Sequence, residues 1–166
     1  MVRCTVIAMV PVVAIGGCTE TADPIVCTSG KLAGTSENQD MTPGQPCNAC
    51  HAYTNSGGDG NEAPIYAFAG TVYTAHHEPD NCVGGTNGGG SAVIEVVSRT
   101  GKRFFAPIFE SGNFMLESDE VTYPITARIT YQGRTRWMIE PQMSGDCNTC
   151  HSEAGGSGAS GRIRLP

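Results

Sequence analysis

The stretch "YPITARITYQGRTRWMIE" (residues 123–140) shows most plainly which kind of fold this chain adopts. Every second residue of its first half is apolar, namely Ile125, Ala127, Ile129 and Tyr131. This alternation is typical of a β-strand with one buried and one solvated face. The dipeptide "QG" at 132–133 separates it from another run of strand formers, so the stretch predicts two short strands joined by a tight turn.

Similar runs of β-branched and aromatic residues come before this stretch. They cover residues 65–74, 91–98, 103–109 and 113–117, and turn formers such as "RTGK" and "ESGN" lie between some of them. Several short strands at this spacing predict a small antiparallel β-sandwich over residues 64–141. The fold class is therefore expected to be mainly β.

The segments on either side of the predicted sandwich differ in composition. Residues 18–63 are rich in loop-forming Gly, Pro, Asn, Ser and Asp and predict a loop-rich segment without a core of its own. Residues 142–152 form a second short segment, and the Gly/Ser-rich residues 153–166 predict a flexible tail. Something other than side-chain packing is expected to organise the first segment.

Residues 1–17 indicate an export signal. They contain one Arg, no acidic residue and an apolar stretch that is shorter than the roughly 20 residues needed to cross a bilayer. The sequence "IGGC" at 15–18 resembles the lipobox of bacterial lipoproteins, which implies that Cys18 is lipid-modified and anchors the protein to a membrane. A plain secretory signal is the alternative, and both predict a periplasmic or cell-surface protein.

The charge of the chain bears on its partners. It has 10 Lys and Arg residues against 16 Asp and Glu, giving a net charge of −6, and the basic residues form no cluster. Nucleic-acid binding rests on phosphate neutralisation by Lys and Arg, so it is not expected here. An acidic surface instead favours weak docking onto basic protein partners.

The pentapeptide Cys-x-x-Cys-His occurs twice, as "CNACH" at 47–51 and as "CNTCH" at 147–151. This is the pattern of covalent c-type haem attachment, in which two thiols bind one porphyrin and the following imidazole binds its iron. The chain is therefore expected to carry two haem c groups. The predicted attachment residues are Cys47, Cys50, Cys147 and Cys150, and the predicted iron ligands are His51 and His151.

Zinc binding and thiol redox chemistry are the competing interpretations of this pattern. A structural zinc ribbon sets its cysteine pairs about 15–20 residues apart, which is far less than the spacing of the two pentapeptides. A thioredoxin-like motif needs a βαβ setting, and no amphipathic helix is apparent after either cysteine pair. Haem attachment is therefore the favoured interpretation.

The chain has four histidines, and the two outside the pentapeptides are adjacent, at His76 and His77. Two haems with two imidazoles each need four histidines, so these two are predicted as the remaining iron ligands, one for each haem. The plain alternative is a polar loop end without a ligand role. Met143 is an alternative axial ligand, because methionine also binds haem iron.

Two cysteines of the mature chain, Cys27 and Cys82, remain outside these motifs. In an oxidising compartment their even number suggests one disulfide, which would tie the N-terminal segment to the loop after His77. Two separate buried thiols are the alternative.

Two family resemblances rest on these residues. Residues 70–140, with "AGTVY", "SAVIEVVSRTGKRF", "ESGNFML" and "ITARITYQGRTRWM", resemble the prealbumin-like, carboxypeptidase-regulatory type of β-sandwich, which mostly serves as a scaffold. The two pentapeptides together with the lipobox resemble multihaem c-type cytochrome lipoproteins of bacterial electron-transfer chains.

This second resemblance implies an exported dihaem electron carrier rather than an enzyme, with both irons six-coordinate. Its partners would be redox proteins, including other cytochromes or copies of itself. Two alternatives remain: a haem enzyme with one open iron site that reduces peroxide or nitrogen oxides, and a protein-binding module in which haem is secondary.

Overall fold

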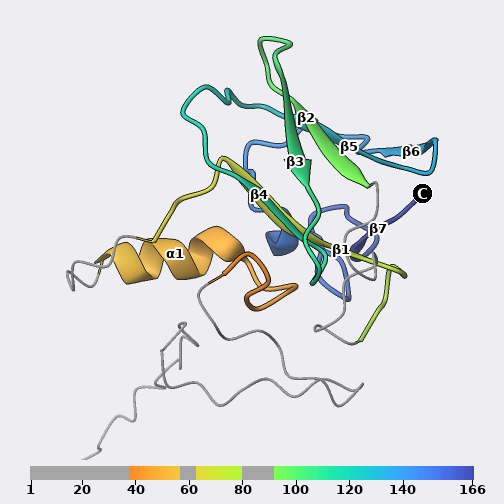
Figure 1. Cartoon of the computed structure of the whole chain (residues 1–166), viewed down its shortest axis with the longest axis horizontal. Helices are drawn as coiled ribbons and strands as arrows, with labels where there is room; N and C mark the ends of the chain where they lie inside the picture. The colour runs from red at the N-terminus through yellow and green to blue at the C-terminus, as the bar shows by residue number, and fades with distance from the viewer. Residues whose placement is uncertain (1–37, 57–62, 80–91) are drawn as a thin grey trace, which may run out of the picture.

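The computed structural model describes residues 38–56, 63–79 and 92–166, and over these residues the protein is mainly β, as the sequence predicts (Figure 1). The helical elements are α1 (Cys47–Ser56) and the 3-10 turn η1 (Cys147–Thr149). The strands are β1 (Phe68–Tyr73), β2 (Val93–Val97), β3 (Arg103–Pro107), β4 (Asn113–Leu116), β5 (Thr126–Tyr131), β6 (Arg134–Trp137) and β7 (Ile163–Arg164). None of the described helices is long and apolar enough to cross a membrane.

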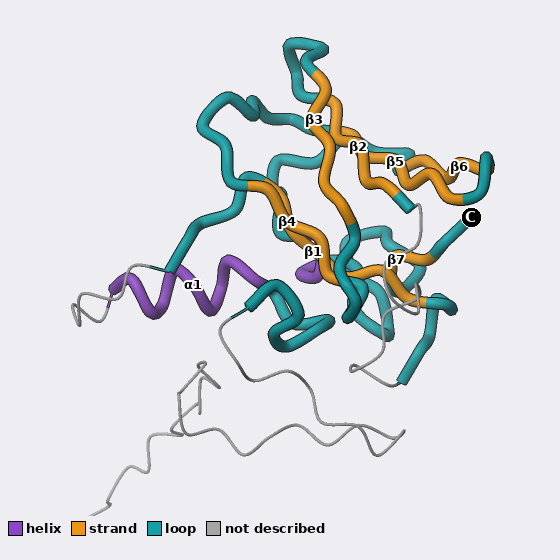
Figure 2. Tube along the Cα trace, viewed as in Figure 1, coloured by secondary structure: helices purple, strands orange, loops and turns teal. Residues whose placement is uncertain are grey.

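The strands form two sheets (Figure 2). The larger sheet has the order β3-β2-β5-β6 and is antiparallel throughout, with β5 and β6 joined by the turn at Gln132 and Gly133. The smaller sheet has the order β4-β1-β7, in which β1 pairs with β4 antiparallel but with β7 parallel. The strand pairs within residues 64–141 are all antiparallel, as expected, and the parallel partner of β1 is β7, which lies outside the predicted sandwich.

The apolar faces of the two sheets contribute to one core. Its largest fully buried apolar members are Phe68, Val72 and Phe114 from the smaller sheet and Val96 from the larger one. The alternation seen in the sequence accounts for β5, where Ile129 is buried and Thr130 on the opposite face is partly exposed. Tyr123 adds a polar link, since its hydroxyl donates to the carbonyl oxygen of Ala67 at 2.5 Å.

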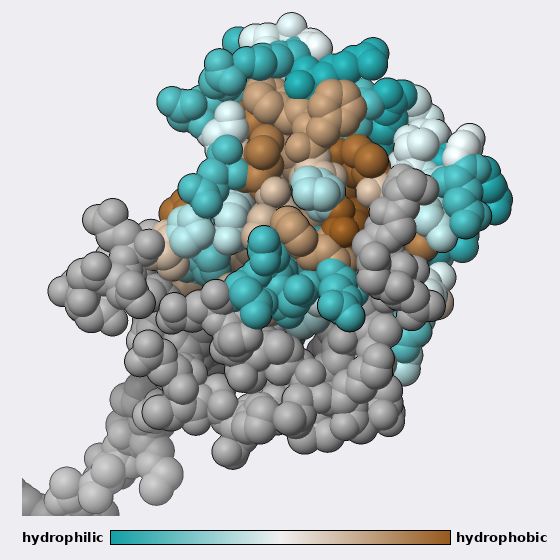
Figure 3. All heavy atoms as spheres, in the orientation of Figure 1, coloured by the Kyte–Doolittle hydropathy of each residue, from teal (hydrophilic) through white to brown (hydrophobic). Residues whose placement is uncertain are grey.

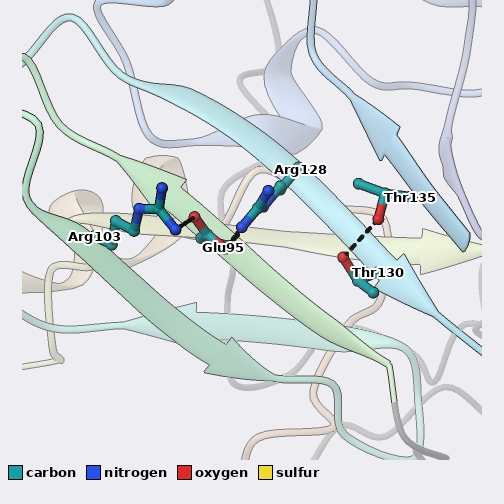
Figure 4. Close-up of polar contacts among 5 residues, drawn as sticks. All are labelled: Glu95, Arg103, Arg128, Thr130 and Thr135. Atoms are coloured by element: carbon teal, nitrogen blue, oxygen red, sulfur yellow. Dashed lines mark hydrogen bonds and ion pairs between the residues drawn. The ribbon is translucent and has the colours of Figure 1, made fainter. Parts of the chain in front are cut away.

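The outer face of the larger sheet carries a charged cluster. Figure 4 shows Glu95 of β2 between Arg103 of β3 and Arg128 of β5, and both arginines pair with its carboxylate. The guanidinium of Arg128 also lies 4.7 Å from the ring centre of Trp137, a cation–π contact. Trp137 is 59% exposed, so it belongs to this surface rather than to the core. Apolar side chains gather on the face seen in Figure 3, over β2 and β3.

The C-terminal segment is part of the fold, and the prediction of a flexible tail over 153–166 is wrong. Ile163 and Arg164 form β7 beside Val72 and Tyr73 of β1. Arg162 is only 3% exposed, and its guanidinium lies 4.3 Å from the ring centre of Tyr73. A two-residue strand has too little periodicity to be found in a Gly/Ser-rich sequence.

The first pentapeptide lies in a helix, although the sequence predicted a loop-rich segment there. The chain before it is tied to β4, because the Asn113 amide donates to the carbonyl oxygens of Gln39 at 3.0 Å and Met41 at 2.8 Å. Helix α1 then begins at Cys47. A loop-rich composition over 18–63 therefore did not exclude a helix of ten residues.

Candidate haem site

A carboxylate from the second motif's segment caps the helix of the first motif. Asp146, directly before Cys147, accepts the backbone N–H of Asn48 at Oδ2, at 3.0 Å. The first N–H groups of a helix lack intrahelical acceptors, and a negative charge there is favourable. Since the cap comes from 98 positions away, the two pentapeptides lie side by side in the fold.

Asn148, the second residue of "CNTCH", holds the second motif in place. The motif itself is a turn closed by a hydrogen bond from the His151 N–H to the Cys147 carbonyl at 2.9 Å. Asn148 is 2% exposed, and its Oδ1 accepts the Thr71 N–H at 3.0 Å while its Nδ2 donates to the Gln45 carbonyl at 2.9 Å. It thereby joins the second motif both to β1 and to the chain just before the first motif.

Asn48 occupies the same position in "CNACH" and has a matching role. Its Nδ2 donates to the carbonyl of Tyr66 at 2.8 Å, and its Oδ1 accepts the Tyr66 N–H at 2.9 Å. Tyr66 lies just before β1, the strand that Asn148 also contacts. The repeated asparagine therefore fixes both motifs to β1 and its approach, a role that the sequence reasoning missed although the repetition was visible.

All four histidines have the same kind of contact. Each Nδ1 lies against a backbone carbonyl oxygen: His51 on Pro64 at 2.5 Å, His76 on Arg162 at 3.1 Å, His77 on Glu153 at 2.7 Å and His151 on Gly161 at 2.9 Å. A carbonyl oxygen can only accept, so Nδ1 is the donor in each contact, and in the neutral tautomer of such a ring the lone pair is on Nε2. Within the described residues, no Nε2 atom of these rings makes a hydrogen bond.

Three of the histidines lie together and the fourth lies apart. His76 and His151 bind adjacent carbonyls of the chain that leads into β7, and His77 binds Glu153, two residues after His151. His51 instead contacts Pro64 and, at 5.1 Å between ring centres, Tyr66, both of which precede β1. In Figure 1, α1 extends to one side of β1, while the chain after β1 and β7 lie at its other end.

The cysteines of the two motifs differ in oxidation state. Cys47, Cys147 and Cys150 are free thiols. Cys50 is disulfide-bonded, and its partner is not among these three. A thioether bond at Cys50 therefore requires its disulfide to be broken first, whereas both cysteines of the second motif are free thiols.

Burial controls the chemistry of two of these thiols. It raises the pKa of Cys47 to about 12, and the nearby Asp146 carboxylate adds to the effect. Burial likewise raises the pKa of Cys147 to about 12, again with Asp146 contributing. Dithiol oxidoreductases need a lowered thiol pKa, so these environments are the opposite of a reactive thiol's.

Asp146 is itself an unusual carboxylate, because it is 8% exposed and its Oδ1 has no hydrogen-bond partner. Burial raises its pKa, while the N–H groups at the start of α1 and His51 act in the opposite direction. A buried carboxylate at this junction connects the electrostatics of the two motifs.

Two glycines make room where the motifs and histidines meet the sheet. A Cβ on Gly70 would lie 2.7 Å from the ring of Phe114 and 2.9 Å from Cβ of Cys147. Gly161 has φ of +134°, and a Cβ there would lie 2.4 Å from the carbonyl oxygen of His76. Larger residues would displace the second motif or the His76 segment.

The remaining candidates fall into two groups. Met143 is 73% exposed, so its sulfur is not packed against a described ligand site, and its role as an alternative axial ligand stays a prediction. The export signal at 1–17, the lipidation site Cys18 and the predicted Cys27–Cys82 disulfide all lie outside the described residues.

Comparison of the chain with protein-family models, curated proteins and solved structures found no match. What the site can do therefore rests on its own residues. Over the described ranges, no three or more His, Cys, Asp and Glu side chains are grouped to hold a metal ion. A haem iron takes only two axial protein ligands, so a search for three or more grouped side chains does not detect such a site.

Proposed function

We propose that this protein is an exported c-type cytochrome that carries electrons, with one haem on each Cys-x-x-Cys-His motif. Cys147 and Cys150 would hold one haem with His151 as iron ligand, and Cys47 and Cys50 would hold the other with His51. His76 and His77 would supply further axial imidazoles. Bound haem supplies one-electron redox chemistry, which the amino-acid side chains alone lack.

One observation carries this proposal: the Nδ1 atoms of all four histidines are hydrogen-bonded to backbone carbonyls. Iron-binding histidines commonly donate their other ring N–H in this way, which fixes the tautomer and the orientation of the ring. A histidine that merely solvates a loop has no need of such a contact. Four such contacts in a chain with four histidines support a ligand role for every one.

The chain's own groups would hold and orient the cofactors. Asn48 and Asn148 fix each motif against β1, so that each cysteine pair and its histidine keep their positions. Asp146 joins the two motifs, which supports a short path between the two bound groups. Lipidation at Cys18 and docking onto redox proteins at a membrane surface belong to the same proposal.

The proposal is tested by the amount of covalent haem in protein made with a cytochrome c maturation system. A pyridine haemochrome assay should give two haems per chain for the natural sequence. It should give one haem for each of two matched double variants, Cys47→Ser with Cys50→Ser and Cys147→Ser with Cys150→Ser. Protein that folds but carries no covalent haem would refute the proposal.

A thiol–disulfide role is the second candidate, and the disulfide at Cys50 is the observation that favours it. The raised pKa of Cys47 and Cys147 argues against it, because a thiol protonated at neutral pH is a poor nucleophile. Reduction of an insulin disulfide by dithiothreitol separates the two candidates. A thiol oxidoreductase would accelerate it, and an electron-carrying cytochrome would not.

A further inference from the structure

The four imidazoles are unequally distributed between the two motifs. The following inference rests on the proposed haem-binding function. His151, His76 and His77 lie at the end of β1 that pairs with β7, and His51 lies before the start of β1. One motif therefore has two further imidazoles beside it, and the other has none among the described residues.

The length of β1, which lies between His51 and the two adjacent histidines, is too large for His76 or His77 to bind the iron held by His51. Strand β1 has six residues and spans roughly 17 Å at about 3.3 Å per residue. Two imidazole nitrogens on one metal ion lie only about 4 Å apart, since metal–nitrogen bonds are about 2 Å long. The sequence-based expectation of one adjacent histidine for each haem therefore does not suit this geometry within a single chain.

The two adjacent histidines are not equivalent. His76 is half-buried and doubly fixed, because its ring binds the Arg162 carbonyl and its own carbonyl accepts the Arg162 N–H at 2.8 Å. His77 is exposed, and its ring makes a single contact, to the carbonyl of Glu153. The fixed ring of His76 therefore suits an iron bound by His151 in the same chain. The exposed ring of His77 is accessible to another molecule.

All four histidines of the chain lie in the described residues, so no further imidazole is available for the iron on His51. We propose that His77 of one copy binds the iron held by His51 in a second copy. Donor and acceptor lie at opposite ends of β1, so the contact is head-to-tail. Such a contact closes into a ring or extends into a filament.

The test compares ligation with assembly in the haem-loaded protein. At high concentration the natural protein should form assemblies larger than a monomer, by size-exclusion chromatography with light scattering, and both haems should be low-spin. On dilution to monomer, one haem per chain should become high-spin and bind carbon monoxide when reduced. Protein concentration is the only variable in this comparison.

Variants identify the histidine. His77→Ala should keep two covalent haems, remain monomeric, and show one high-spin haem at every concentration, with added imidazole restoring the low-spin spectrum but not the assembly. His76→Ala, the matched control, should disturb the haem on His151 and leave assembly intact. The circular dichroism spectrum of each variant verifies folding.

A mixing experiment gives the sharpest result. His77→Ala chains have an acceptor haem but no donor, and Cys47→Ser/Cys50→Ser chains have the donor but no acceptor. Each should be monomeric alone, and their mixture should form dimers in which the high-spin haem becomes low-spin.

Three outcomes would overturn the inference. Both haems could stay low-spin in monomeric His77→Ala, which indicates a ligand such as methionine from the same chain. One haem could stay high-spin at every concentration in the natural protein, which indicates the open site of an enzyme. Both outcomes leave the two-haem proposal standing, whereas the absence of covalent haem refutes the proposed function as well.

Discussion

Substitution of Asn148 by alanine tests whether the repeated asparagine fixes the motifs to β1. The change removes the side chain that satisfies the Thr71 N–H and the Gln45 carbonyl. Leaving a buried polar group without its partner costs about 1–3 kcal/mol. With two such groups, we expect the free energy of unfolding to fall by roughly 2–6 kcal/mol, a large part of the about 5–15 kcal/mol typical of a domain.

Equilibrium urea unfolding of the purified chain measures this loss, with Thr149→Ala as the matched control. Thr149 is the next residue of the same pentapeptide and is exposed, so its loss should change the stability by less than about 0.5 kcal/mol. If Asn148→Ala does not fold, the partly buried Asn48→Ala should show a smaller loss of about 1–3 kcal/mol. Equal midpoints for the Asn148 and Thr149 variants, at equal denaturant slopes, would contradict the clamping role.

Three further predictions use the same assay. Asp146→Ala removes the cap on the Asn48 N–H and should cost about 1 kcal/mol, and an unchanged midpoint would argue against the cap. Gly161→Ala forces a Cβ into the His76 carbonyl at a positive φ and should cost roughly 1–3 kcal/mol, whereas a neutral effect would show that this junction is not constrained. Burial raises the pKa of Tyr123 above its usual 10.0, so the folded state keeps this proton longer and stability should fall as the pH rises above about 10. Tyr123→Phe should lessen that fall, and an identical pH dependence in the variant would refute the assignment.

Runs of β-branched and aromatic residues, separated by turn formers, were sufficient to predict strands β1 to β6. The alternation of Ile125 to Tyr131 predicted β5, and the "QG" turn predicted the hairpin to β6. The β1–β7 pairing could not be found in this way. Strand β7 has two residues in a Gly-rich segment, and its pairing with β1 is a tertiary contact without a local pattern.

Helix α1 was missed for a similar reason. Its sequence "CNACHAYTNS" contains several weak helix formers, and the residue that caps it is Asp146, which is distant in the chain. The candidate site was found from the two pentapeptides and the histidine count alone. Its unequal arrangement, with His51 apart from the other three histidines, depends on the length and direction of β1 and on the β7 pairing, which composition and spacing do not encode.

The mass of the intact denatured chain, made with a cytochrome c maturation system, shows whether haem is attached to the two motifs, because only covalently attached haem survives denaturation. We expect the mass of the mature polypeptide plus two haem groups. The mass of the polypeptide alone, from protein that folds normally, would contradict it.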